Sequence, residues 1–265
     1  MSLPPAFKGF SRLLRLDLNS VLIAPAELKK LISKCPMLEY VDLHNLDREA
    51  EKLEIDASNL KYFSFFGSFN LICFKNASRL TKMSMTCFID EKLDYDMFED
   101  YAIFDPYESD GNLIEVLGQL SYLKSNGRFL KFLARGGVSW KLPTNLSHLT
   151  DLCLSSFRFQ CIAQVMCALC LIRSSPNLQS LEIIICRFSG LEPEMEFVKH
   201  LLSAATALRK LEIGSNYAAK TGKGSKMLKE LVSFCLASPK ATDHISRSPL
   251  PIKWFHLKLT CCLEI

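Results

Sequence analysis

The chain has 265 residues, of which 49% are hydrophobic and 23% are charged, and its formal net charge is +4. This balance is ordinary for a globular protein and excludes a largely disordered chain. A net charge of this size indicates a nucleic-acid partner only when the basic residues cluster, and here they are spread along the chain.

No targeting segment is evident at the N-terminus, MSLPP, which lacks the basic region and the apolar core of a signal peptide. The longest apolar stretch, residues 161–172, is too short to cross a bilayer. We therefore expect no membrane association and a location in the cytoplasm, the nucleus or both. The 11 cysteines lie mostly in hydrophobic runs, which in a reducing compartment is typical of small buried residues.

Three stretches of the sequence align without a gap. They are LISKCPMLEYVDL (31–43), LIRSSPNLQSLEI (171–183) and LLSAATALRKLEI (201–213). Each contains the end of an apolar helix, a short turn and the pattern L-x-x-L-x-L, which is the signature of a leucine-rich repeat. Repeats of this kind stack because no single unit can bury its own leucines.

Seven L-x-x-L-x-L units follow one another along the chain. They begin at Leu13, Leu38, Leu60, Leu80, Leu149, Leu178 and Leu208. The first register is ambiguous by one residue, because Leu14 follows Leu13. Successive spacings are 25, 22, 20, 69, 29 and 30 residues. The interval of 69 residues predicts an insertion and one or two degenerate repeats, for which 113–123 and 129–133 are the candidates.

The repeat lengths predict how the chain returns from one strand to the next. The longer repeats have room for helices, which we expect at about 25–33, 162–173 and 193–205. The shorter ones should return in an extended conformation, with short strands at 53–55 and 71–74. The fold class is therefore α/β: a curved leucine-rich-repeat solenoid with strands on the concave face and helices or short strands on the convex face.

The turns that follow the strands depart from the common repeat pattern, which places Asn or Cys three residues after the last leucine. The equivalent residues are Val21, Leu46, Ser68, Phe88, Phe157, Cys186 and Asn216. Only the last two fit, so the other turns must be stabilised in a different way.

Residues 90–110 contain nine acidic residues and one basic residue, together with an aromatic residue at every third position from Tyr95 to Tyr107. We interpret about 89–111 as an acidic insert that packs on the solenoid or is half-ordered. The alternative is an acidic, aromatic peptide that a partner captures.

The outward positions of the strands should form the concave face, where solenoids of this type usually bind their partners. On adjacent strands these positions hold Tyr40, His44, Tyr62 and Phe66. Large amphipathic side chains of this kind dominate the energetics of protein interfaces. We therefore predict a partner-binding site at these four residues; the alternative is that some of them pack under the acidic insert.

The other candidate residue groups do not indicate a metal-binding, phosphate-binding or catalytic site. Cys161, Cys167 and Cys170 are closer to a helix core than to a zinc site, which needs four ligands. Residues 220–226, KTGKGSK, do not match a phosphate-binding loop, and the five histidines are scattered. We expect no catalytic residues, no cofactor and no metal, and hence no enzyme.

From Leu3 to about residue 241 the chain resembles plant F-box proteins of the FBD and leucine-rich-repeat group. The motifs that carry the resemblance are FKGFSRLLRLDL (7–18), LISKCPMLEYVDL (31–43), LEIDASNLKYFSFFGSF (53–69), ALCLIRSSPNLQSLEI (168–183), FSGLEPEMEFVKHLLSAATALRKLEI (188–213), MLKELVSF (227–234) and ASPKA (237–241). The resemblance divides the chain into repeats at 1–187, an FBD-like segment at 188–241 and an atypical tail at 242–265.

The resemblance implies a non-catalytic substrate receptor of a cullin–RING ubiquitin ligase, in which the repeats bind a target protein and an F-box binds the ligase adaptor. Residues 1–265 contain no F-box ahead of the repeats, so we expect the adaptor as a partner only where an F-box lies upstream. The connection at residues 186–188 is shorter than in the family, and the tail is unlike the usual ending. The alternative is a free-standing interaction protein, or a truncated isoform that competes for targets without recruiting a ligase.

Overall fold

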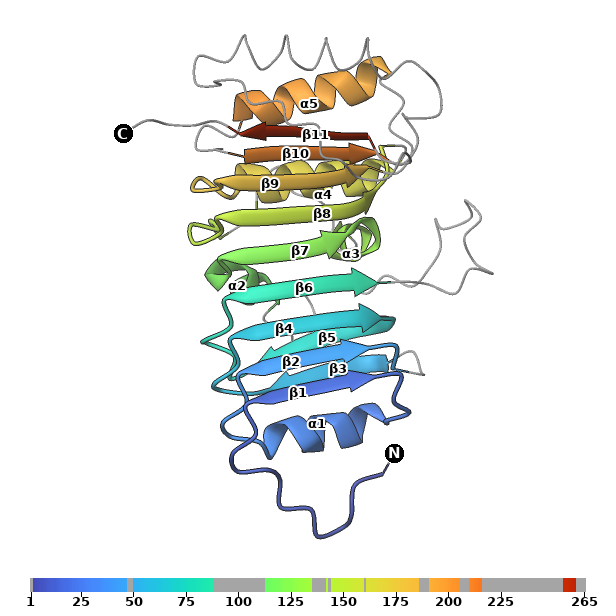
Figure 1. Ribbon diagram of the computed structural model, residues 1–265, viewed down its shortest axis with the longest axis vertical. Coiled ribbons are helices and arrows are strands. Elements are labelled where there is room, and N and C mark those ends of the chain that lie inside the picture. Colours follow the sequence, from blue (N-terminus) through green and yellow to red (C-terminus); the bar gives the residue numbers. More distant parts are fainter. Residues whose placement is uncertain are drawn as a thin grey trace.

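A computed structural model describes residues 2–46, 50–87, 113–134, 142, 144–159, 161–185, 191–204, 210–215 and 255–260. The molecule is built as a stack, in which each repeat adds one strand to a nine-stranded sheet and then returns behind that sheet (Figure 1). The sheet strands are β1 (Arg15–Asn19), β2 (Tyr40–His44), β4 (Tyr62–Gly67), β6 (Lys82–Cys87), β7 (Tyr122–Asn126), β8 (Asp151–Phe157), β9 (Ser180–Ile185), β10 (Lys210–Ser215) and β11 (Phe255–Thr260).

All seven predicted repeats are confirmed, because a strand begins two residues after the first leucine of each L-x-x-L-x-L unit. The first strand follows the Leu13 register rather than the Leu14 register. From β1 to β10 the strands are parallel, and equivalent residues lie side by side. Alternate side chains of each strand therefore form continuous rows on the two faces of the sheet.

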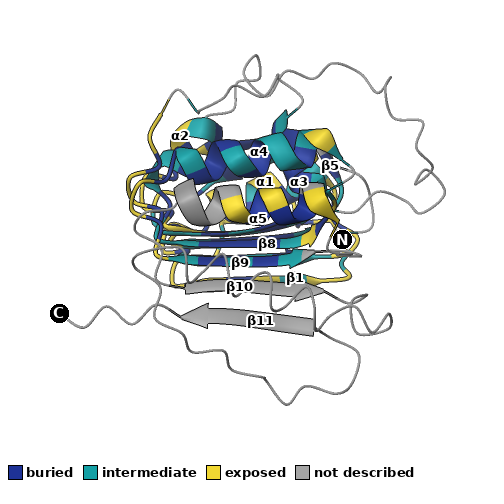
Figure 2. Cartoon of the chain, turned by 90° about the horizontal axis from the view of Figure 1, so that it is seen from above, coloured by how far each residue is buried: buried dark blue, intermediate teal, exposed yellow. Residues whose placement is uncertain are grey.

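The return segments form a second layer. They are α1 (Pro25–Ser33), β3 (Ala50–Asp56), β5 (Phe69–Lys75), α2 (Leu113–Gln119), α3 (Gly127–Leu133), α4 (Ile162–Arg173) and α5 (Glu192–Ala204). Figure 2 shows this layer along one face of the sheet. The helices predicted from the longer repeats are confirmed, with α5 starting one residue earlier than expected, and the short repeats return through the parallel pair β3 and β5.

In the described part of the long interval between the fourth and fifth predicted repeats there is one further strand, β7, with α2 before it and α3 after it. Its motif is Leu120-x-x-Leu123-x-Ser125, with serine in place of the third leucine. The candidate 113–123 is thus confirmed as a repeat. The candidate 129–133 is wrong as a repeat of its own, because it lies in the helix of the same unit. The acidic insert and residues 220–226 lie outside the described residues.

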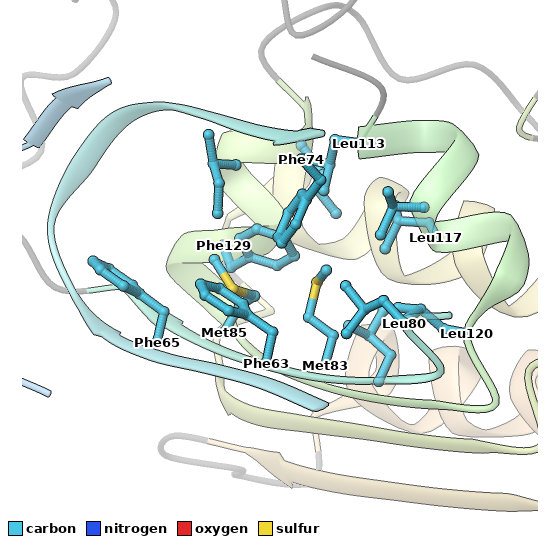
Figure 3. Close-up of a cluster of buried hydrophobic side chains, with 14 of the residues drawn as sticks. Phe63, Phe65, Phe74, Leu80, Met83, Met85, Leu113, Leu117, Leu120 and Phe129 are labelled. Atoms are coloured by element: carbon cyan, nitrogen blue, oxygen red, sulfur yellow. The ribbon is translucent and has the colours of Figure 1, made fainter. Parts of the chain in front are cut away.

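The core lies between the two layers. The inward side chains of β4 and β6, Phe63, Phe65, Met83 and Met85, are at most 2% exposed and point toward α2, α3 and β5 (Figure 3). Phe63 meets Phe74 of β5 edge to face, with ring centroids 5.2 Å apart. Burial of this continuous apolar row provides the main favourable contribution to folding.

The turns after β1 and β2 are stabilised without an asparagine at the usual position, three residues after the last leucine. Ser20 and Asn45 adopt left-handed backbone angles, with φ of 54° and 50°. The Ser20 amide then donates to the His44 carbonyl (2.9 Å), and the Asn45 amide donates to the Phe66 carbonyl (2.8 Å). Backbone groups of one turn therefore bond to the next strand, and no side chain is needed for these two bonds.

An ion cluster joins the helical first repeat to the extended ones. The Glu54 carboxylate of β3 lies 2.8 Å from the ammonium groups of both Lys29 in α1 and Lys75 in β5. Hydrogen bonds from Lys29 and then Lys75 lower the pKa of Glu54 to about 2. The carboxylate is thus charged at neutral pH and links three neighbouring return segments.

The end of the sheet differs from the rest. The segment 255–260, part of the sequence interpreted as an atypical tail, forms β11 and pairs antiparallel with β10. Leu257 stands opposite Ile213, and Leu259 stands opposite Leu211, so this strand matches the apolar register of the repeats. Tail residues 242–254 and 261–265 lie outside the described residues.

Candidate protein-interaction face

The sheet presents one face to the helix layer and the other outward, and we call the outward side of β1 to β9 the open face. It corresponds to the predicted concave face. Within the described part of the chain, every helix lies on the opposite side (Figures 1 and 2). The first outward row consists of Arg15, Tyr40, Tyr62, Lys82, Tyr122, Asp151 and Ser180, which occupy equivalent positions on consecutive strands.

The structure brings the four predicted site residues together as an aromatic patch, defined as Tyr40, Tyr62, His44 and Phe66. The rings of Tyr40 and Tyr62 stack with centroids 4.1 Å apart and an interplanar angle of 11°. Two strands of a sheet are about 4.8 Å apart, so in-register tyrosines on neighbouring strands are already near stacking distance. The patch is therefore a direct consequence of the repeat register.

A second stack lies four residues further along the same strands. The rings of His44 and Phe66 are 5.6 Å apart with an angle of 24°. The Nε2 atom of His44 lies 2.8 Å from Oδ1 of Asp42, on the same strand. All four aromatic residues are partly exposed, so the patch is ordered by its own contacts and still open to a partner.

Arg15 extends the aromatic patch toward the N-terminal edge of the sheet. Its guanidinium carbon lies 4.4 Å from the centroid of the Tyr40 ring, a cation–π contact. The pKa of Tyr40 is raised, first because the side chain is partly buried and second because it forms a hydrogen bond with the neighbouring Tyr62 hydroxyl. The phenol is thus a neutral hydrogen-bond donor at physiological pH.

Comparison with known proteins agrees with the repeat architecture. Residues 1–183 match the family model described as FBD-associated F-box protein At5g56370, LRR repeats. The chain belongs to this leucine-rich-repeat family. It is also 29% identical, over 274 aligned positions, to the F-box/FBD/LRR-repeat protein At1g13570 of Arabidopsis thaliana. The alignment covers 90% of this chain and 63% of that relative, so the chain spans less than two thirds of the relative's length.

The leucine-rich-repeat register also places on the open face a tyrosine that the sequence reasoning missed. Tyr122 of β7 lies in the first row, separated from Tyr62 by Lys82. Burial raises its pKa to about 12, with smaller contributions from Cys153, Tyr62 and other neighbours. The signal that could have revealed it is the motif LSYLKS at 120–125, which keeps two of the three leucines.

The cysteines of α4 lie in the interior of this leucine-rich-repeat chain rather than at its open face. Cys167 and Cys170 are buried, and Cys161 precedes the helix. Burial raises the pKa of Cys167 to about 12 and also raises that of Cys170. A zinc ligand must be a thiolate, so this environment favours the core interpretation. Within the described residues no group of three or more His, Cys, Asp or Glu side chains is placed to hold a metal ion.

No helix in the described part of this family member is long and apolar enough to cross a lipid bilayer.

Proposed function

We propose that this chain is the target-binding part of an F-box-type substrate receptor of a cullin–RING ubiquitin ligase, and that it acts without catalytic residues of its own. The observation that carries the proposal is the aromatic patch, which lies on an open sheet face of a protein from an F-box-associated repeat family. Stacked repeats offer a long surface that suits recognition of another protein.

The chemistry of the patch is that of a binding hot spot. Tyrosine and arginine are enriched among the residues that dominate binding energy, because each combines a large apolar area with a polar end. Here Arg15, Tyr40 and Tyr62 already stack on one another in the unbound chain. Since their rotamers are restricted before binding, these side chains lose less conformational entropy when a partner docks.

The relative At1g13570 is named as an F-box, FBD and repeat protein, and the matched region is only part of its length. In the proposed function an F-box upstream of the repeats binds the ligase adaptor, while the open face holds the target in the cytoplasm or nucleus. A chain that binds targets without recruiting the adaptor would instead compete with such receptors. Co-purification of the adaptor with the protein from plant cells separates these two roles.

We expect Tyr40→Ala combined with Tyr62→Ala to reduce target capture by at least about tenfold while the chain stays folded. Loss of one hot-spot tyrosine typically costs about 2 kcal/mol of binding free energy, which is more than a factor of ten. The measurement is quantitative mass spectrometry of proteins captured from plant cells treated with a proteasome inhibitor.

The matched control is Met37→Ala combined with Ile162→Ala, which removes exposed apolar side chains away from the open face. Proteins captured by the wild type and the control, but not by the tyrosine variant, are candidate targets. They should also accumulate when the proteasome is inhibited. Equal capture by all three proteins would rule out the aromatic patch as the target site.

A further inference from the structure

The centre of the open face carries two lysines, Lys82 of β6 and Lys124 of β7, on neighbouring strands. Lys82 is exposed and Lys124 is half-buried. Their outward direction follows from the alternation of the strands, because Met83, Met85 and Leu123 are buried on the other face. Among the residues that the structure describes, neither lysine has an acidic partner.

The acidic side chains nearer the N-terminal edge of the open face already have partners. Asp17 lies 3.7 Å from the Arg15 guanidinium, and Asp42 lies 2.8 Å from His44. On the other side, Asp151 of β8 accepts a hydrogen bond from the Thr150 hydroxyl (2.7 Å). Among the described residues, none of these carboxylates forms an ion pair with Lys82 or Lys124.

Neutral hydrogen-bond donors surround the two lysines. Tyr62 and Tyr122 occupy the same row as Lys82 on the strands to either side of it. Ser84, in register with Lys124, adds a hydroxyl next to both lysines. Because burial raises the pKa of Tyr122 to about 12, its phenol keeps its proton at neutral pH. Ammonium and hydroxyl donors together suit a carboxylate, which accepts hydrogen bonds only.

We propose that this lysine pair, defined as Lys82 and Lys124, binds an acidic Asp/Glu segment of the target protein. The inference rests on the proposed function and names the chemistry of the partner. Lys82 and Lys124 are one strand and two residues apart, so their Cα atoms are separated by about 8 Å. In an extended peptide, residues i and i+2 point to the same side and are about 6.7 Å apart. The segment that fits best therefore carries two carboxylates separated by one residue.

Acidic residues of the open face limit how far the acidic segment of the target can extend toward β8 and β9. Asp151 of β8 and Glu182 of β9 lie on the open face beyond Tyr122, and both contribute to the raised pKa of that tyrosine, after burial. Their negative charge would repel a run of carboxylates that continued across β8 and β9. The acidic part of the target should accordingly be short and should lie over β4, β6 and β7, next to the aromatic patch.

The test uses the full chain and a fluorescein-labelled peptide that contains Glu-x-Glu in a glycine and serine background. We expect binding by fluorescence anisotropy that weakens between about 50 mM and about 300 mM salt, because exposed charges are screened. Lys82→Glu combined with Lys124→Glu should weaken this binding at least about tenfold. Comparison peptides carry Lys-x-Lys, or phosphoserine-x-phosphoserine, in the same background.

The control variant is Lys8→Glu combined with Lys30→Glu, which makes the same change of net charge away from the open face. It should leave the affinity within about twofold of the wild type. The inference is wrong if both charge variants weaken binding equally, if neither does, or if the Lys-x-Lys peptide binds best. Preference for the phosphoserine peptide, with no measurable binding of Glu-x-Glu, would equally overturn it.

Failure of this inference is distinguishable from failure of the proposed function. Suppose that the variant with both lysines replaced by glutamate captures targets as well as the wild type, while the variant that lacks Tyr40 and Tyr62 does not. In that case the open face binds targets, but the part of the target over the lysine pair is not acidic. If neither variant loses targets, the open face itself is not the binding surface.

Discussion

Phe63→Ala lowers the free energy of unfolding by about 3–5 kcal/mol, the usual cost of removing a fully buried phenylalanine. The Phe63 side chain is 0% exposed and lies between the sheet and β5, where its ring meets that of Phe74 at 89° (Figure 3). Removal of the ring leaves a cavity that the neighbouring strands cannot fill, because they are fixed by ladders on both sides. Thermal unfolding followed by circular dichroism measures the effect.

The control for this prediction is the preceding residue of the same strand. Tyr62 points to the open face, so Tyr62→Ala should cost at most about 1.5 kcal/mol, the contribution of its stack with Tyr40. Similar losses for Phe63→Ala and Tyr62→Ala would mean that the two side chains do not face opposite sides of the sheet.

Asn126→Ala lowers the free energy of unfolding by about 2–4 kcal/mol, since one buried side chain serves three backbone groups. Its Oδ1 accepts from the amides of Phe129 (3.0 Å) and Cys87 (3.2 Å), and its Nδ2 donates to the Cys87 carbonyl (2.6 Å). It therefore caps α3 and holds the end of β6 at the same time. Alanine removes all three hydrogen bonds at a site where the Asn126 side chain is only 6% exposed.

Two variants make the Asn126 result specific. Asn19→Ala removes an asparagine from the third outward position of β1, where it is exposed, and should change stability by less than about 0.5 kcal/mol. Asn126→Asp keeps the two acceptor bonds but loses the donor to Cys87, so its melting temperature should fall between wild type and Asn126→Ala. A melting temperature of Asn126→Ala equal to that of the wild type would contradict the role of this side chain.

The strand positions could be predicted because the repeat pattern specifies which residues are buried. Each L-x-x-L-x-L unit fixes two inward side chains on a strand, and stacking then fixes the register between strands. The same logic placed Tyr40 beside Tyr62 and His44 beside Phe66, because neighbouring repeats put equivalent residues side by side. That these residues bind a partner stays a prediction.

The parts that sequence reasoning missed have identifiable causes. The sequence located a degenerate repeat at 113–123 but did not give the position of its strand, because Ser125 occupies a leucine position, and both Tyr122 and the role of Asn126 were therefore missed. The strand β11 follows no repeat motif and runs in the opposite direction, so only its pairing with β10 reveals that it belongs to the sheet. The sequence did not reveal the lysine pair, because only the pairing of β7 with β6 places Lys124 next to Lys82.

The central claim is that the target lies on the open face, and site-specific photocrosslinking tests it most directly. Benzoylphenylalanine is introduced in place of Phe66 on the open face or in place of Ile162, which is 77% exposed at the start of α4. We expect the target captured by the wild-type chain to crosslink to the position of Phe66 and not to that of Ile162. Crosslinking of the same target from the Ile162 position, with none from the Phe66 position, would contradict the claim.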